Sequence, residues 1–241
     1  MAQRGDASPT ADGVSRPRRS PGVPSPIACV VLGICASSVI VASAWLATRP
    51  GAETAQTDLV VWFNAPPQPF GAILAVVNPL LRPFPLTLLG IALLAWIVLT
   101  ARGRFMRLEI VRCAAVAYAI AQITATVLKH LANQPRPLFV VPNLDTHGYP
   151  GDPNGNAYPS AHTAVVVAIV AATWPWVRWP QRLVGVVVAV LIAFNRLYIG
   201  AHWPIDVVGG VAIGLLAAAI AWLIAQRWPM NVGARDGGRA L

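Results

Sequence analysis

Long apolar runs constrain the fold of this chain more than any other feature. Runs of about 20 apolar residues recur along its 241 residues, and this is the length that an α-helix needs to cross the hydrocarbon core of a bilayer. The composition agrees, because 56% of the residues are hydrophobic and only 11% are charged, against roughly 25% charged in a soluble domain. The sequence therefore predicts an all-α protein that is embedded in a membrane.

The pattern predicts a six-span transmembrane helical bundle. We expect a disordered cytoplasmic tail over residues 1–26, which are rich in Ser, Pro, Gly and Arg, a membrane domain over 27–228 and a cytoplasmic tail over 229–241. Short extracytoplasmic interfacial helices are expected around 58–63 and 70–81, between prolines. The six expected spans are 27–48, 86–100, 109–131, 160–177, 183–199 and 204–226.

The basic residues predict how the bundle is oriented. The net charge is +9, and a basic protein can bind nucleic acid, but here the arginines form short clusters between apolar runs. Positive loops of this kind are typical of the cytoplasmic side of a membrane protein. Thirteen of the 18 basic residues fall on the side that holds both termini. We therefore expect a plasma-membrane protein with both termini in the cytoplasm and no nucleic-acid partner. The other side carries Arg49, Arg82, Lys129, Arg136 and Arg196.

Three polar clusters lie at span ends on the predicted outer face. They cover residues 129–137, 158–162 and 195–206. Ionisable residues at the ends of membrane spans are costly unless they are paired or solvated, so their convergence indicates a functional site on the extracytoplasmic side.

The residue types in these clusters suit a phosphate ligand. Arg136 and Arg196 carry planar forks that bind two phosphate oxygens at once, and Lys129 supplies a point charge. Ser160 stands at the expected N-cap of the fourth span, ahead of the backbone N–H of Ala161. Because the fourth and sixth spans both begin on this face, two positive helix ends are expected to point at one anion.

The histidines divide the expected chemistry. His202 precedes Asp206 by four residues, about one helical turn, so the two side chains can meet on one helix face. An aspartate that accepts from one ring nitrogen leaves the other free to act as a nucleophile. We expect His202 to attack phosphorus, and His162 to protonate the leaving alcohol and then activate water.

The three clusters resemble the motifs of the type 2 phosphatidic acid phosphatase family, the lipid phosphate phosphatases, which are related to vanadate-dependent haloperoxidases. Lys129 and Arg136-Pro137 match the first motif at full spacing, and Pro159-Ser160 with His162 match the second. The third is matched by Arg196, His202 and Asp206. The resemblance implies an all-helical, metal-independent phosphatase that works through a phosphohistidine. The chain departs from the family pattern at Ala161, where the family has Gly, and at Asn195, where it has Ser.

Other readings use some of the same residues. His162, His202 and Asp206 have ligand types that suit zinc, but three nearby cations would repel a divalent metal, so no metal or cofactor is expected. A catalytically silent relative should have lost His202, His162 or the arginines, all of which are present. A transporter should show inverted repeats and broken helices. A vanadate-dependent haloperoxidase is not expected, because those enzymes are soluble and this chain is predicted to be embedded in a membrane.

The expected substrate is a lipid phosphate monoester or diphosphate. Polyprenyl diphosphate, phosphatidate, phosphatidylglycerophosphate and prenyl-phospho-sugars all fit, and a polyprenyl substrate is favoured by the resemblance. The oligomeric state is left open. Residues 138–158 are expected to form a connecting loop with some substrate contact, and His130 and His147 are left outside the site.

Overall fold

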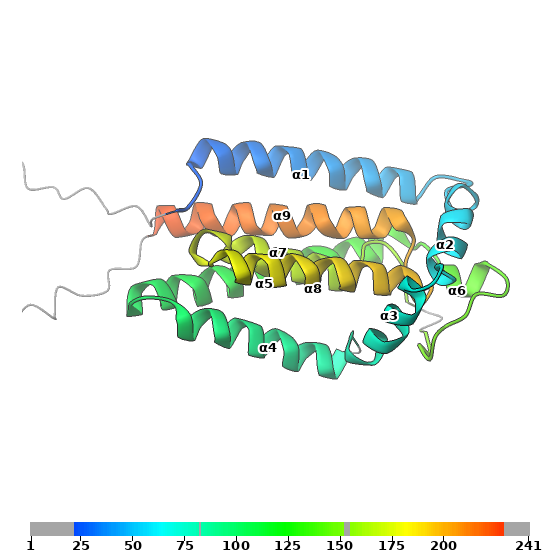
Figure 1. Cartoon of the computed structure of the whole chain (residues 1–241). Coiled ribbons are helices and arrows are strands. Elements are labelled where there is room, and N and C mark those ends of the chain that lie inside the picture. Colours follow the sequence, from blue (N-terminus) through cyan, green and yellow to red (C-terminus); the bar gives the residue numbers. More distant parts are fainter. Residues whose placement is uncertain (1–21, 82, 152–154, 229–241) are drawn as a thin grey trace, which may run out of the picture.

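The structure is a computed structural model that describes residues 22–81, 83–151 and 155–228. Throughout these residues it contains helices and no strand, which confirms the predicted all-helical fold. Most of the expected N-terminal tail and all of the expected C-terminal tail lie outside the described residues. Six longer helices run side by side and form a bundle (Figure 1). They are α1 (Pro26–Ala47), α4 (Pro83–Thr100), α5 (Arg104–Ala132), α7 (Ala161–Thr173), α8 (Trp179–Tyr198) and α9 (Pro204–Arg227).

Each of these helices coincides with one expected span to within a few residues. Four of them, α1, α5, α8 and α9, are long and apolar enough to cross a membrane. Helix α4 contains a shorter apolar stretch, and α7 continues through the 3-10 turn η3 (Trp174–Trp176) into a second one. The positions of six helices are therefore confirmed, whereas the count of six spans remains a prediction.

Local signals set several helix boundaries. Pro26 and Pro204 occupy first-turn positions, where the missing N–H of proline costs nothing. The Ser25 side chain caps α1 by accepting the N–H of Ala28 at 3.2 Å. Gly103 connects α4 to α5 with a φ of 86°, a conformation that glycine adopts without a steric penalty.

Helix α9 packs at the centre of the bundle, against α1, α5 and α7. Small residues make this close approach possible. A Cβ added to Gly214 would lie 2.7 Å from Val167, and one added to Gly210 would lie 2.7 Å from the carbonyl oxygen of Ser160. These glycines therefore let α7 pack directly against α9.

Short helices gather at one end of the bundle, opposite the start of α1 and the end of α9 (Figure 1). Those around the predicted interfacial segments are η1 (Thr54–Gln56), α2 (Thr57–Asn64), α3 (Phe70–Val77) and η2 (Asn78–Leu81), and α6 (Pro137–Val140) follows the first motif. Their presence confirms the helices expected around 58–63 and 70–81.

Candidate active site

The three motifs meet at the end of the bundle that carries the short helices. Backbone hydrogen bonds join them. The N–H of Ser160 in the second motif donates to the carbonyl of Asp206 in the third at 3.0 Å, and the N–H of Leu138 donates to the carbonyl of Gly200 at 3.0 Å. The indole N–H of buried Trp203 also donates to the carbonyl of Pro135 at 2.8 Å. Segments far apart in sequence are thus fixed as one unit.

His202 and Asp206 form the pair that the sequence predicted. The Nδ1 atom of His202 lies 3.3 Å from Oδ2 of Asp206, and both side chains are buried. Their arrangement differs from the expected shared helix face, because α9 begins at Pro204 and His202 precedes it. Asp206 instead caps the helix, since its Oδ2 also accepts the N–H of Trp203 at 2.8 Å. The carboxylate therefore fixes the helix start and the imidazole together.

The surroundings of His202 keep its ring neutral. Burial lowers the pKa of His202 well below its ordinary value, and the positive charges of Lys129, Arg136 and Arg196 lower this pKa further. Both causes act in the same direction, because a buried ring close to cations resists gaining a proton. With Nδ1 directed at Asp206, the lone pair of a neutral ring is left on Nε2.

The cations of the first motif are held by backbone carbonyls. Lys129 lies in the last turn of α5 and donates to the carbonyl of Asn156 at 2.7 Å and to that of Ala157 at 3.2 Å. Arg136 precedes α6, and its Nε donates to the carbonyl of Gly155 at 3.1 Å, while its Nη1 donates to the hydroxyl of Tyr149. The residues just before the second motif therefore hold both cations of the first.

Arg196 is buried and is oriented by a chain of amide side chains. Its Nη2 donates to Oδ1 of Asn195 at 2.6 Å and to the carbonyl of Leu81 at 3.3 Å. Asn195 in turn donates to Oδ1 of Asn78 at 2.7 Å, and Asn78 donates to the carbonyl of His147 at 2.9 Å. Asn195, which replaces the family's Ser, thus acts as both donor and acceptor. We call Asn78 and Asn195 the asparagine relay.

The start of α7 brings in Ser160 and His162. Ser160 occupies the N-cap position, as predicted, and its hydroxyl shares a hydrogen bond of 2.9 Å with the hydroxyl of Thr163. Ala161 is the first residue of the helix, and His162 follows it. All eight residues predicted for the site therefore lie on the joined motif segments.

The loop expected over residues 138–158 begins within α6, and the rest of it is anchored in its described part, which omits residues 152–154. Asn64 on α2 donates to the carbonyls of Asp145 and Tyr198, at 2.7 and 2.6 Å. The ring of His147 stacks on Tyr198 with 3.7 Å between ring centroids. Sequence reasoning missed Asn64, Asn78 and Tyr149. His147 supports the loop, and the exposed His130 bonds to the carbonyl of Thr126 at 2.7 Å.

In residues 22–81, 83–151 and 155–228, no cluster of three His, Cys, Asp or Glu side chains is placed to hold a metal ion.

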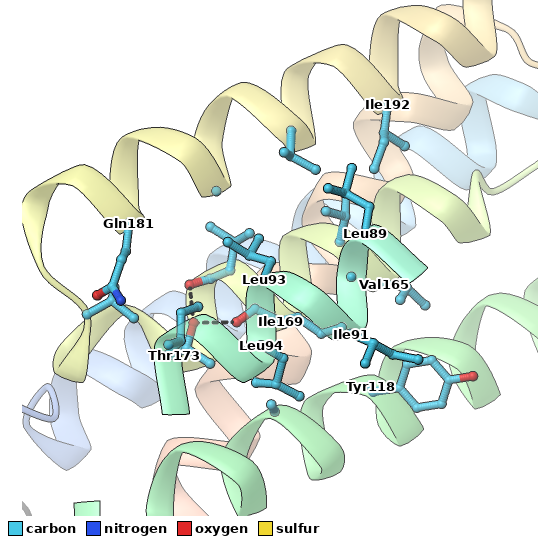
Figure 2. Close-up of a pocket in the computed structure, with 18 of the residues that line it drawn as sticks. Leu89, Ile91, Leu93, Leu94, Tyr118, Val165, Ile169, Thr173, Gln181 and Ile192 are labelled. Atoms are coloured by element: carbon cyan, nitrogen blue, oxygen red, sulfur yellow. Dashed lines mark hydrogen bonds between the residues drawn. The ribbon is translucent and has the colours of Figure 1, made fainter. Parts of the chain in front are cut away.

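A cavity of about 660 Å³ adjoins the site. It begins at Ala161 and His162 and runs between α4, α5, α7 and α8 as far as Gln181. Figure 2 shows that apolar side chains of α4 and α7 line its middle.

Part of this sequence matches proteins that are named as undecaprenyl-diphosphatases. Undecaprenyl-diphosphatase from Sulfolobus acidocaldarius is 32% identical over 106 residues, which cover 41% of this chain and 47% of that protein. The putative undecaprenyl-diphosphatase YbjG from Escherichia coli is 32% identical over 130 residues, which cover 52% of this chain and 64% of that protein. The matches thus span about half to just under two thirds of the length of these relatives.

Two crystal structures share the fold. Aquifex aeolicus LpxE aligns with a TM-score of 0.56 at 23% identity, over 69% of this chain and 94% of that protein. The PAP2 type phosphatidylglycerolphosphate phosphatase of Bacillus subtilis, a transmembrane protein, aligns with a TM-score of 0.56 at 16% identity, over 86% of this chain and 98% of that protein. A model of the PAP2 superfamily matches residues 110–230. This match covers half of the chain and includes all three motifs, so the chain belongs to the PAP2 superfamily.

Proposed function

We propose that this protein is an integral-membrane lipid phosphate phosphatase that forms a phosphohistidine intermediate. The observation that carries the proposal is the state of His202, a buried ring that is oriented by Asp206 and placed among Lys129, Arg136 and Arg196. A neutral imidazole surrounded by fixed cations is suited to attack an anionic phosphorus centre.

The reaction proceeds in two displacements at phosphorus. Nε2 of His202 attacks the terminal phosphorus, and the bond from that phosphorus to the leaving oxygen breaks while protonated His162 donates a proton to that oxygen. The leaving oxygen belongs to the lipid alcohol in a monophosphate and to the lipid monophosphate in a diphosphate. His162, now neutral, then removes a proton from a water molecule whose oxygen attacks the phosphohistidine. Inorganic phosphate leaves, His202 is restored, and His162 has regained its proton.

The remaining site residues hold the phosphoryl group. Lys129, Arg136 and Arg196 stabilise the charge on its equatorial oxygens, which is the main requirement of phosphoryl transfer. The Ser160 hydroxyl and the N–H of Ala161 add neutral donors at the start of α7. On this assignment the reaction needs neither a metal nor another cofactor.

The bundle crosses the membrane six times, with both termini in the cytoplasm and the site outside. Residues 27–228 form the membrane domain. Its two shorter apolar segments are α4 with 18 residues and Ala161–Trp176. At 1.5 Å per residue they reach about 24 to 27 Å, close to the ~30 Å of a hydrocarbon core, so both are proposed to span it. The excess of arginines at the end opposite the motifs supports this orientation.

Cysteine labelling tests the orientation. In a Cys35→Ser background, which removes the exposed native thiol, an impermeant maleimide should label Asn143→Cys in intact cells. Arg102→Cys, at the opposite end of the bundle, should react only after permeabilisation. The reverse pattern would invert the proposed topology.

A polyprenyl diphosphate is the favoured substrate. The names of the two undecaprenyl-diphosphatase relatives support it, as does the long apolar cavity that adjoins His162. Phosphatidate and phosphatidylglycerophosphate are the alternatives, and hydrolysis of a substrate panel separates them.

The decisive experiment measures phosphate release from that panel by detergent-purified protein in the presence of a chelator. His202→Ala should abolish release, and a ³²P-labelled substrate should leave an acid-labile, base-stable label on the parent protein but not on this variant. His130→Ala is the matched control, because His130 is exposed and outside the machinery. Release by His202→Ala at the parental rate, or release that requires added zinc, would overturn the mechanism.

A further inference from the structure

The cavity beside His162 extends along α7 from Ala161 to Thr173. Its walls are formed mainly by aliphatic residues of α4, α5, α7 and α8, among them Leu93, Leu94, Val165 and Ile169. Figure 2 shows Leu89, Leu93, Val165 and Ile169 along the cavity, with Gln181 and Thr173 towards the end away from Val165. A volume of about 660 Å³ lies in the range of small-molecule binding sites.

One end of this cavity touches the catalytic residues. Ala161 and His162 contribute to its lining, so a phosphate held by the motifs would place its ester oxygen at the cavity mouth. Ile91 on α4 and Tyr118 on α5 line the cavity and are 60% and 48% exposed. One side of the cavity therefore opens towards the surrounding lipid, and a tail can enter sideways without leaving the hydrocarbon phase.

Polar side chains line the other end of the cavity, which we call the polar floor. The amide nitrogen of buried Gln181 donates to the hydroxyl of Thr100 at 2.7 Å and joins α8 to α4. The hydroxyl of Thr173 bonds within its own helix, to the carbonyl of Ile169 at 2.9 Å. Because these polar groups already have hydrogen-bond partners, the methyl end of a lipid tail can contact them without leaving a buried donor unsatisfied.

The depth of the cavity sets a chain length. From Ala161 to Thr173, α7 advances by twelve residues, which is ~18 Å at 1.5 Å per residue. An extended carbon chain with bonds of ~1.5 Å advances ~1.3 Å per carbon, so about 14 carbons reach the floor.

We propose that this cavity binds about the first 14 carbons of a single lipid tail and thereby selects substrates by tail length. The inference rests on the proposed function, since it assigns the tail of the same substrate. Carbons beyond this length leave through the open side into the bilayer and add nothing to recognition. A substrate with a shorter tail leaves part of the cavity unfilled.

Photo-crosslinking tests the path of the tail. The probes are two hexadecyl phosphonates, which cannot be hydrolysed at phosphorus, with a diazirine at carbon 4 or carbon 12. At ~1.3 Å per carbon, carbon 4 should label the level of Val165 and Leu89, and carbon 12 the level of Thr173 and Gln181. The proposal would be overturned if both probes labelled the outer surface of α1, or if both labelled the cavity at a single depth.

Substitutions that fill the cavity test the length selection. Gly90 lines it, and a Cβ added there would have no atom of the described residues within 4 Å, so Gly90→Phe fills the cavity near its mouth. Ala115 lines it one helical turn beyond Tyr118, towards the floor, so Ala115→Phe blocks it at greater depth. Ala92→Phe is the matched control, because Ala92 is exposed on α4 and does not line the cavity.

The readout is the ratio of kcat/KM for hexadecyl phosphate to kcat/KM for butyl phosphate. We expect this ratio to fall at least 10-fold in Gly90→Phe, less in Ala115→Phe, and not in Ala92→Phe. An unchanged ratio in both cavity variants would refute the tail site while phosphate release still supported the phosphatase. Failure of the parent protein to hydrolyse any lipid phosphate would instead refute the proposed function. If Gly90→Phe does not fold, the crosslinks on the parent protein decide the question.

Discussion

The asparagine relay makes a quantitative prediction about Arg196. Asn195 is fully buried, and its Oδ1 accepts a hydrogen bond of 2.6 Å from the guanidinium. Asn195→Ala removes this acceptor from a buried charged group, and a hydrogen bond to a charged group contributes about 1.5–3 kcal/mol. Because Arg196 binds the phosphoryl oxygens in the proposed mechanism, the loss should appear as a fall of about 10- to 150-fold in kcat/KM.

The second member of the relay should matter less and only through the first. Asn78→Ala removes the acceptor of the Asn195 side chain, a bond between neutral groups worth about 0.5–1.5 kcal/mol, so kcat/KM should fall about 2- to 10-fold. The double variant should be no worse than Asn195→Ala alone, because both substitutions act on one guanidinium. Asn195→Ser, which restores the family's hydroxyl, should recover part of the activity.

The assay measures kcat/KM for one lipid phosphate and the inhibition constant of orthovanadate, which adopts the five-coordinate geometry of the transition state. Positioning of Arg196 predicts that both quantities change by the same factor. Thermal unfolding of each variant, monitored separately, detects a general loss of structure. Additive losses in the double variant, or vanadate binding that stays unchanged while kcat/KM falls, would refute the relay.

Three further predictions concern protonation, packing and the connection between motifs. Burial and neighbouring cations lower the pKa of His202, so its ring stays neutral below pH 6.5. We therefore expect kcat/KM, corrected for substrate ionisation, to decline only well below that pH. Lys129→Met removes one of these cations and should move the decline to higher pH. A single-proton limb at the ordinary histidine pKa would contradict this. Gly214→Ala should lower the free energy of unfolding by about 1–3 kcal/mol, because the added Cβ would lie 2.7 Å from Val167. Gly90→Ala should leave this free energy unchanged, because no described atom lies within 4 Å of its added Cβ. Equal melting temperatures for the two variants would count against the packing argument. Trp203→Phe removes the hydrogen bond from the indole N–H to the carbonyl of Pro135 and should lower the free energy of unfolding by about 1–3 kcal/mol. Denaturation in detergent measures this change. An unfolding midpoint equal to that of the parent protein would show that this hydrogen bond does not hold the motifs together.

The sequence predicted the helices well because their signals are local. Apolar runs with prolines at their starts, such as Pro26 and Pro204, mark a helix without reference to the rest of the chain. The motif residues could be singled out for the same reason, because their spacing is contained in three short segments.

The geometry around His202 shows where spacing alone was insufficient. An i, i+4 pair fits a helix face, yet the sequence Trp203-Pro204-Ile205-Asp206 also carries a capping signal, with Pro at the first helical position and an acidic residue at the third. The expected sixth span begins at residue 204 and already agrees with this signal, so it was the i, i+4 spacing that wrongly placed His202 on the helix.

Other parts of the site have no local signal at all. Asn78 and Asn195 are 117 residues apart, and Asn64 meets Asp145 across 81 residues. No periodicity links such pairs, because their hydrogen bonds depend on how helices from distant segments come together. The cavity depends in the same way on the spacing between four helices.

The carbonyls of residues 155–157 have a consequence for anion selectivity. They occupy two of the three donors of Lys129 and one of the five donors of Arg136, so an arriving anion competes with charge-assisted hydrogen bonds for part of each cation. At the donors that already have a carbonyl partner, a free inorganic ion exchanges one oxygen acceptor for another and gains little. In the proposed enzyme this internal competition weakens retention of the released phosphate, so turnover continues where the ion is abundant.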